Sequence, residues 1–170
     1  MTNQRFAAGM LLATSMALAA GAANSPKPVN AKKLDALEVQ ALEAMKQRAA
    51  ELKVTGVAVV NYAPGETVQA WTSKMAVVGR MIDPKASANG NNLLGIAYAK
   101  SAEMADTLEN SGTAKRPPMT GEFGWQGGII AQVKSGKTGS GHIIVSFSGG
   151  KSEDDVEVSK AGLEVMKKGL

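Results

Sequence analysis

Hydrophobic residues recur at helical spacing in three segments of the chain. In residues 34–52 they return every three or four positions, and Gly56 follows the segment, so the pattern predicts an amphipathic helix. Residues 93–108 show the same spacing ahead of Gly112. The pattern returns a third time after Ser152, and the sequence therefore predicts three helices.

Four shorter segments have patterns that are typical of strands. Residues 57–60 are apolar on both faces, as in a central strand that is covered on each side. Residues 68–73, 129–134 and 142–148 alternate between the two faces. Turn-forming residues separate the first two segments and the last two, so each pair predicts a β-hairpin. The predicted order is helix, hairpin, helix, hairpin, helix, with loops at residues 79–92 and 113–124.

The start of the last helix is predicted from its capping residues. Ser152 is the expected N-cap, and Asp155 three residues later makes an imperfect capping box. Glu153, Asp154 and Asp155 would lie in the first turn, where the helix dipole favours each carboxylate by about 0.3–1 kcal/mol. Side chains of consecutive helical residues point about 100° apart and do not converge on one ion. We therefore prefer capping to a metal site or an acid/base pair.

One segment is close to a phosphate-binding loop. Residues 131–141 read AQVKSGKTGSG, in which Gly136, Lys137 and Thr138 match G-x-x-x-x-G-K-[ST] but Ala131 replaces the first glycine. In a true phosphate loop the lysine and threonine open a helix. Here a predicted strand follows instead, so we interpret the segment as a hairpin turn without a nucleotide.

Composition and charge narrow the class of protein. The chain has 170 residues, of which 44% are hydrophobic and 20% charged, as expected of one globular domain. The absence of cysteine excludes disulfides, cysteine–zinc sites and a lipid anchor on cysteine. Aromatic residues make up only 4%, and the net charge of +4 comes without a basic run. We therefore expect no nucleic-acid partner.

The N-terminal residues have the pattern of a secretory signal peptide. Arg5 precedes an apolar run over residues 6–20, and alanines at 20 and 22 fit the cleavage rule. We expect residues 1–24 to be removed and the protein to be periplasmic or secreted. The apolar run is short for a membrane span, so none is expected in the mature form. Residues 25–33 are predicted as an extended lead-in and residues 34–170 as a single domain.

The predicted domain contains several short motifs: KM at 74–75, AKSA at 99–102, GGII at 127–130, SGG at 148–150, SEDD at 152–155 and AG at 161–162. With these motifs the domain resembles the GlcG/HbpS-like family of small heme-binding and glycolate-operon proteins. The resemblance covers nearly all of residues 34–170. Three family positions differ here: Asn61 replaces an aspartate, Ile130 replaces a proline, and no Asp-Gly-Ala follows Met75.

The resemblance implies a fold, an assembly and a ligand. The fold is α/β of the α+β type, profilin-like, with an antiparallel β-sheet built from two hairpins and flanked by helices. Family members usually assemble into homo-oligomers, and some bind heme. We therefore expect an exported homo-oligomer that binds a small apolar or amphipathic ligand, with heme as the leading cofactor.

Candidate ligand-binding residues follow from that expectation. His142 is the single histidine, so it forms neither a two-histidine metal site nor a recognisable catalytic triad. If heme binds, His142 or a loop methionine such as Met75 would ligate the iron. Lys74, Arg80 or Lys100 could then pair with the propionates. The alternatives are a locally hydrogen-bonded His142, packed methionines, and a Lys100 that pairs with a carboxylate.

Gly127 and Gly128 complete the set of candidate cofactor-binding residues. Glycine permits a positive φ or a close approach of the backbone, here beside a ligand site or a subunit interface. Two other functions stay open. One is an enzyme or accessory protein for a small hydroxy or keto acid, although no catalytic dyad is recognisable. The other is a non-catalytic assembly protein in which every marked residue serves packing.

Overall fold

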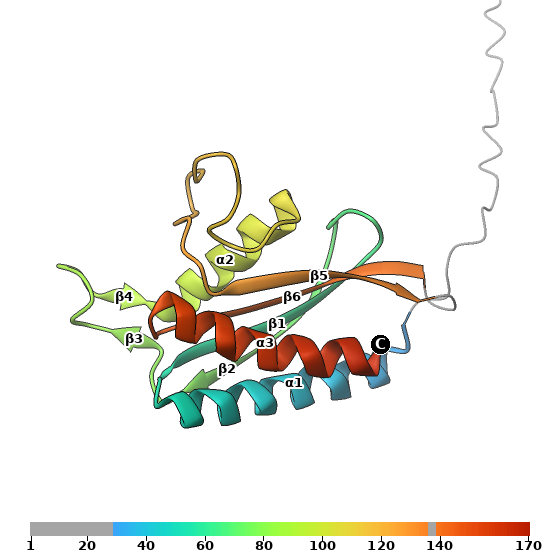
Figure 1. Cartoon of the computed structure of the whole chain (residues 1–170), viewed down its shortest axis with the longest axis horizontal. Coiled ribbons are helices and arrows are strands. Elements are labelled where there is room, and N and C mark those ends of the chain that lie inside the picture. Colours follow the sequence, from blue (N-terminus) through green and yellow to red (C-terminus); the bar gives the residue numbers. More distant parts are fainter. Residues whose placement is uncertain (1–28, 136–138) are drawn as a thin grey trace, which may run out of the picture.

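The computed structural model describes residues 29–135 and 139–170 (Figure 1). The predicted signal peptide therefore lies outside the described residues, as do Gly136, Lys137 and Thr138 of the phosphate-loop lookalike. The elements in chain order are α1 (Ala31–Leu52), β1 (Gly56–Pro64), β2 (Thr72–Val78), β3 (Ile82–Asp83), β4 (Asn91–Asn92), α2 (Leu93–Thr107), β5 (Gly128–Ser135), β6 (Gly139–Ser148) and α3 (Ser152–Gly169).

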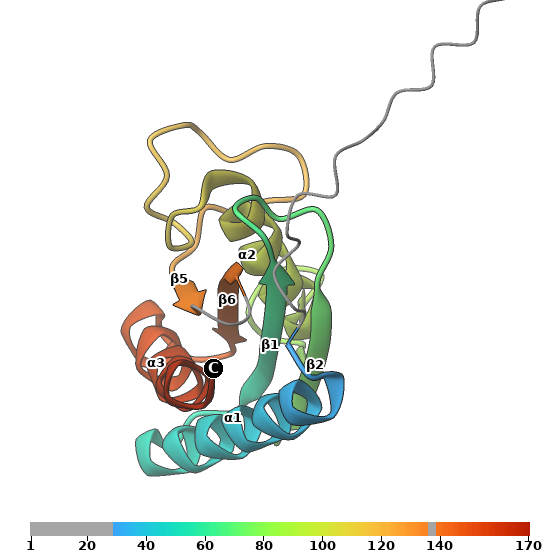
Figure 2. The ribbon, with the colours of Figure 1, turned by 90° about the vertical axis from the view of Figure 1, so that its right-hand side faces the viewer.

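Four strands form one antiparallel sheet in the order β2-β1-β6-β5. The two hairpins, β1–β2 and β5–β6, join through the central pair β1 and β6. Helices α1 and α3 cover one face of the sheet, and α2 covers the other (Figures 1 and 2). This arrangement confirms the predicted α+β, profilin-like fold of two hairpins flanked by helices. The short strands β3 and β4 pair separately, within the segment predicted as a loop.

The alternation of side chains along the central strands creates two different layers. Val145 and Phe147 of β6 pack in the main core with α1 and α3. Val57 and Val59 of β1 pack under α2. Because side chains alternate along a strand, His142, Ile144 and Ser146 of β6 lie on the side of the sheet that α2 covers, which we call the α2 layer. In agreement with this, Ser146 Oγ donates a hydrogen bond to the Ala97 carbonyl of α2.

The positions of the helices agree with the hydrophobic periodicity, but the starts of α1 and α3 differ from the predicted ones. Helix α1 begins at Ala31, three residues before the predicted start, because the Asn30 side chain accepts hydrogen bonds from the Lys32 and Lys33 amides. Helix α3 begins with Ser152, so the prediction of Ser152 as N-cap is wrong. Its N-cap is Lys151, which makes no side-chain cap bond. The Gly150 amide donates to Asp155 Oδ1 at 2.8 Å instead.

The second strand lies further along the chain than predicted. Residues 68–73 alternate, but β2 runs from Thr72 to Val78, and most of the predicted segment belongs to the connection between β1 and β2. Packing decides the position, because Ala76 and Val78 contact the main core whereas Val68 and Ala70 do not. A six-residue alternation is too short to outweigh that burial.

Strands β5 and β6 pair where the sequence predicts a hairpin. Ser135 is opposite Gly139 in the register of the two strands, and β6 continues as a strand to Ser148. The residues that follow Thr138 thus form a strand, starting at Gly139, rather than the helix that a phosphate-binding loop would open. Across residues 29–135 and 139–170, no helix combines the length and the apolar character needed to cross a membrane.

Candidate functional site

A cavity of about 620 Å³ lies between the first turns of α1 and the adjoining ends of β1 and β2. We call it the α1 cavity. Its volume is in the range of small-molecule sites, which are apolar clefts with a few placed polar groups. Its lining includes the apolar residues Val29, Ala31, Leu34, Tyr62 and Pro64 and the polar residues Asp35, Glu38, Thr72 and Lys74.

Helix and strand geometry bring these side chains together. Ala31, Leu34, Asp35 and Glu38 recur at intervals of three or four on α1 and therefore share one face. Tyr62 of β1 is paired with Thr72 of β2, and Lys74 follows two residues later on the same face. The cavity thus lies between this face of α1 and the end of the sheet formed by Tyr62, Thr72 and Lys74, on the side of the sheet that α1 covers.

Glu38 is the buried polar group of this cavity. Its side chain is 3% exposed, and Thr72 Oγ1 donates a 2.5 Å hydrogen bond to its Oε1. Burial raises the pKa of the Glu38 carboxyl, and the Thr72 hydrogen bond and the Lys74 charge oppose that shift. At the more exposed rim, Lys74 Nζ lies 2.7 Å from Asp35 Oδ1. The cavity therefore contains two carboxyl groups and one amine.

A second polar site lies between α2 and α3. Lys100 and Asp155 form an ion pair whose side chains are 3% and 5% exposed. Lys100 Nζ donates to Asp155 Oδ2 at 2.8 Å and to the Phe147 carbonyl at 2.7 Å. Desolvation lowers the pKa of Lys100 and raises that of Asp155, while the attraction between the two opposes both shifts. Burial thus disfavours the charged form of each partner.

The glycines predicted as candidates lie beside this ion pair. Gly127 has a φ of +125°, and a Cβ there would lie 2.3 Å from Lys100 Nζ. A Cβ on Gly128 would lie 2.4 Å from Met104 Cε. Gly127 is therefore required by its backbone conformation and by the ion pair, whereas a side chain at Gly128 would have to displace the end of Met104. The hollow above the pair has a volume of about 140 Å³, well below the size of an ordinary ligand pocket.

His142 and Met75 lie in the α2 layer and are not brought together. His142 is on β6 and 3% exposed, and Met75 is on the edge strand β2, partly buried against the Val57–Val59 cluster. Among the described residues, His142 Nδ1 is one of three buried side-chain atoms without a hydrogen-bond partner. Neither residue lines the α1 cavity, the hollow over Lys100 or a third cavity of about 650 Å³.

The third cavity is a surface groove between α2 and the β1–β2 connection. Its lining includes exposed side chains of Gln69, Ala70 and Leu108. The α1 cavity differs because Leu34, Glu38 and Tyr62 are buried at its base. We therefore take the α1 cavity as the candidate binding site. Within the described part of the chain, no group of three or more acidic or histidine side chains could hold a metal ion.

The candidates named from sequence thus fall into three places. Lys100 and Gly127 meet at the buried ion pair, His142 and Met75 lie under the α2 layer, and Lys74 lines the α1 cavity. Sequence reasoning missed Glu38. It lies one turn after Leu34 and one residue after Leu37, so an acidic side chain on the buried stripe of α1 was the available signal.

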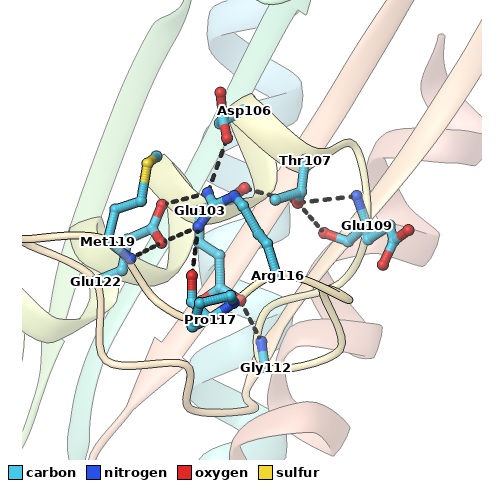
Figure 3. A network of polar contacts seen from close by, with 9 residues as sticks. All are labelled: Glu103, Asp106, Thr107, Glu109, Gly112, Arg116, Pro117, Met119 and Glu122. Carbon is cyan, nitrogen blue, oxygen red and sulfur yellow. Dashed lines mark hydrogen bonds and ion pairs between the residues drawn. The ribbon is translucent and has the colours of Figure 1, made fainter.

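The segment between α2 and β5 is ordered by a polar network (Figure 3). Arg116 contacts Glu122 at 2.7 Å and 2.8 Å and Asp106 at 2.8 Å. The Met119 amide donates to Glu122, and the Gly112 amide donates to Glu103 at 2.8 Å. The network fixes a segment that carries the stacked rings of Phe123 and Trp125.

We expect Arg116→Ala to loosen this segment and leave the sheet intact. The Arg116 hydrogen bonds, followed by the Met119 amide, lower the pKa of Glu122 from 4.5 to about 2. A carboxyl with a depressed pKa adds stability above its unfolded pKa and loses it as the pH falls through the folded value. The protection of the amides of residues 109–127, measured relative to their intrinsic exchange rates, should therefore fall in the variant at neutral pH, and in the wild type near pH 2. Unchanged exchange in the variant would contradict this role.

No family model matches this chain, and no curated protein matches it. Among solved structures, a crystal structure of a PduOC:heme complex is similar, with a TM-score of 0.45 and 18% identity over 81% of this chain and 94% of that one. A likeness of this size assigns neither a family nor a ligand to the present chain.

Proposed function

We propose that this protein binds a small amphipathic molecule in the α1 cavity. The observation that carries the proposal is a cavity of about 620 Å³ with apolar walls and a buried carboxyl, that of Glu38, at its base. Buried polar groups in an apolar site normally fix the orientation of a ligand. An extracytoplasmic location and a homo-oligomeric state, which the leader pattern and the family resemblance imply, are parts of this proposal.

Heme is the ligand that the resemblance implies, but the residues of one subunit do not fit it. His142 and Met75 line none of the three cavities. Tyr62 does line the α1 cavity, but Asp35 and Glu38 lie there too and would repel the propionates. Lys74, Arg80 and Lys100, the expected propionate partners, already pair with Asp35, Asp83 and Asp155. The cavity-lining residues thus do not support heme binding, which stays a prediction from the family resemblance.

The two alternative functions gain less support. An enzyme for a hydroxy or keto acid needs basic groups that converge on an anion. In the described residues the α1 cavity has one lysine and two carboxyl groups, and Lys100 is enclosed with Asp155. A purely structural assembly protein would have no reason to keep a cavity with a buried carboxyl at its base.

Filling the α1 cavity should abolish ligand retention. Ala31 lines the cavity and is exposed, so Ala31→Trp places an indole there without disturbing the core. Ala36 is also exposed on α1 but lies outside the cavity lining, which makes Ala36→Trp a matched control. We expect native mass spectrometry of protein from its own host to show a retained small molecule in the wild type and in Ala36→Trp, and none in Ala31→Trp. Equal retention in both variants would place the ligand elsewhere.

A hemin titration tests the heme prediction separately. Because His142 is 3% exposed and lines none of the three cavities, we expect His142→Ala to leave the Soret spectrum of added hemin the same as in the wild type. Circular dichroism checks that the variant is folded. A Soret shift that disappears in His142→Ala would show that His142 ligates iron and would move the site to the α2 layer.

A further inference from the structure

The charges around the α1 cavity are unequal. Asp35, Glu38 and Lys74 line it, so ionisation of all three leaves one negative charge in excess. Lys74 is already engaged, since its Nζ lies 2.7 Å from Asp35 Oδ1 and that contact raises the pKa of the lysine. The excess charge therefore belongs to Glu38.

Within residues 29–135 and 139–170, Glu38 has a hydrogen-bond donor but no cation at contact distance. Its hydrogen bond comes from the neutral Thr72 hydroxyl, and it makes no ion pair within 4.0 Å with another described residue. A buried carboxylate without a paired cation is costly, and its pKa rises as a result. The direction of the Glu38 shift, set mainly by burial, agrees with that environment. A cation that reached Glu38 would remove this cost.

The walls of the cavity define the other end of a ligand. Val29, Leu34, Tyr62 and Pro64 line it with aliphatic and aromatic surface. Burial of a hydrocarbon group there favours binding in proportion to the apolar surface removed from water. A fatty acid of the same size would bury the same surface, but its carboxylate would meet Asp35 and Glu38. The sign of the polar end therefore distinguishes possible ligands.

We propose that the ligand of the α1 cavity is a hydrophobic amine, whose ammonium group pairs with Glu38 while its hydrocarbon part contacts Leu34 and Tyr62. This inference rests on the proposed function, because it names the ligand class of the same cavity. Charge-assisted hydrogen bonds between an ammonium and a carboxylate are about twice as strong as neutral ones. Glu38 is then the residue that determines specificity for a cation over an anion.

Three probes of equal chain length test the inference: n-octylamine, n-octanol and n-octanoate, each titrated calorimetrically into the purified protein. We expect the amine to bind more tightly than the alcohol, and the carboxylate to bind most weakly. In Glu38→Gln, which keeps the size of the side chain and can still accept from Thr72, amine affinity should fall by on the order of tenfold and alcohol affinity should not change. Glu43→Gln, on an exposed residue of α1, is the matched control and should bind like the wild type.

A second variant tests the same inference without changing the buried residue Glu38. Asp35→Asn acts at the rim, where the carboxyl is 63% exposed, and it releases Lys74 as an unpaired cation. It should also weaken amine binding and strengthen octanoate binding. If octanoate binds the wild type as tightly as octylamine, or if Glu38→Gln binds the amine unchanged, the inference is overturned while the proposed function stands. Failure of the proposed function has a different signature, namely equal ligand retention by Ala31→Trp and Ala36→Trp.

Discussion

Replacing Lys100 with alanine is expected to lower the free energy of unfolding by about 3–5 kcal/mol, because it leaves a buried charge without its partner. Asp155 would keep the Gly150 amide but lose the 2.8 Å contact to Lys100 Nζ, and the Phe147 carbonyl would lose its 2.7 Å donor. Urea unfolding followed by circular dichroism measures the loss. A loss below about 1 kcal/mol, typical of exposed pairs, would contradict this account of the site.

Two further variants separate the cost of an unpaired buried charge from the cost of lost side-chain packing. Burial shifts the pKa of both partners toward the neutral forms, so the pair is not a net source of stability relative to apolar residues. The double variant Lys100→Met with Asp155→Leu should therefore recover much of the loss. Lys46→Ala removes an exposed pair with Glu43 and should cost little.

The Lys100→Ala deficit should also depend on pH. The pKa of Asp155 is already raised, and removal of Lys100 raises it further. An acid whose folded pKa exceeds its unfolded pKa stabilises the fold when it is protonated, and that contribution is lost as the pH rises through the folded value. The deficit should therefore shrink as the pH falls toward the ordinary pKa of aspartate. A deficit that grows on acidification would contradict this assignment.

Gly127→Ala is expected to cost about 3 kcal/mol or more, from strain and overlap together. The φ of Gly127 is +125°, and a Cβ would lie 2.3 Å from Lys100 Nζ and 2.7 Å from Asp155 Cβ. Neither group can move without disturbing the ion pair. The free energy of unfolding in urea is the measurement.

Gly121→Ala is the matched control for the steric part of that effect. Gly121 also has a positive φ, +95°, but a Cβ there would meet nothing within 4 Å. Its replacement should cost only the backbone strain of about 1–2 kcal/mol. Equal losses at the two positions would show that contact with the ion pair contributes nothing at Gly127.

The helices were predictable because their signal is long and redundant. The periodicity of α1 and α2 extends over several turns, and it placed the end of α1 at Leu52 and the start of α2 at Leu93 correctly. The position of β2 was not predictable from alternation alone, since several registers of a short segment alternate equally well. Contacts of Ala76 and Val78 with the main core select the observed one.

The site was less predictable than the fold because it depends on which strand faces are brought together. Lys100 and Gly127 were recognisable as unusual residue types, a lysine within an apolar helix and a glycine before a strand. That they lie side by side follows only from tertiary packing, which brings the Lys100–Asp155 ion pair next to the start of β5. Lys74 and Met75 are adjacent in sequence, yet alternation sends them to opposite faces of the sheet. The two side chains therefore do not line the same cavity.

A crystal structure of the protein with the ligand that it retains from its host would show directly where that ligand binds. We predict electron density between α1 and the adjoining ends of β1 and β2, in contact with Leu34 and Tyr62 and with the polar end of the ligand at Glu38. Ligand density in the α2 layer beside His142, with the α1 cavity filled only by solvent, would contradict it.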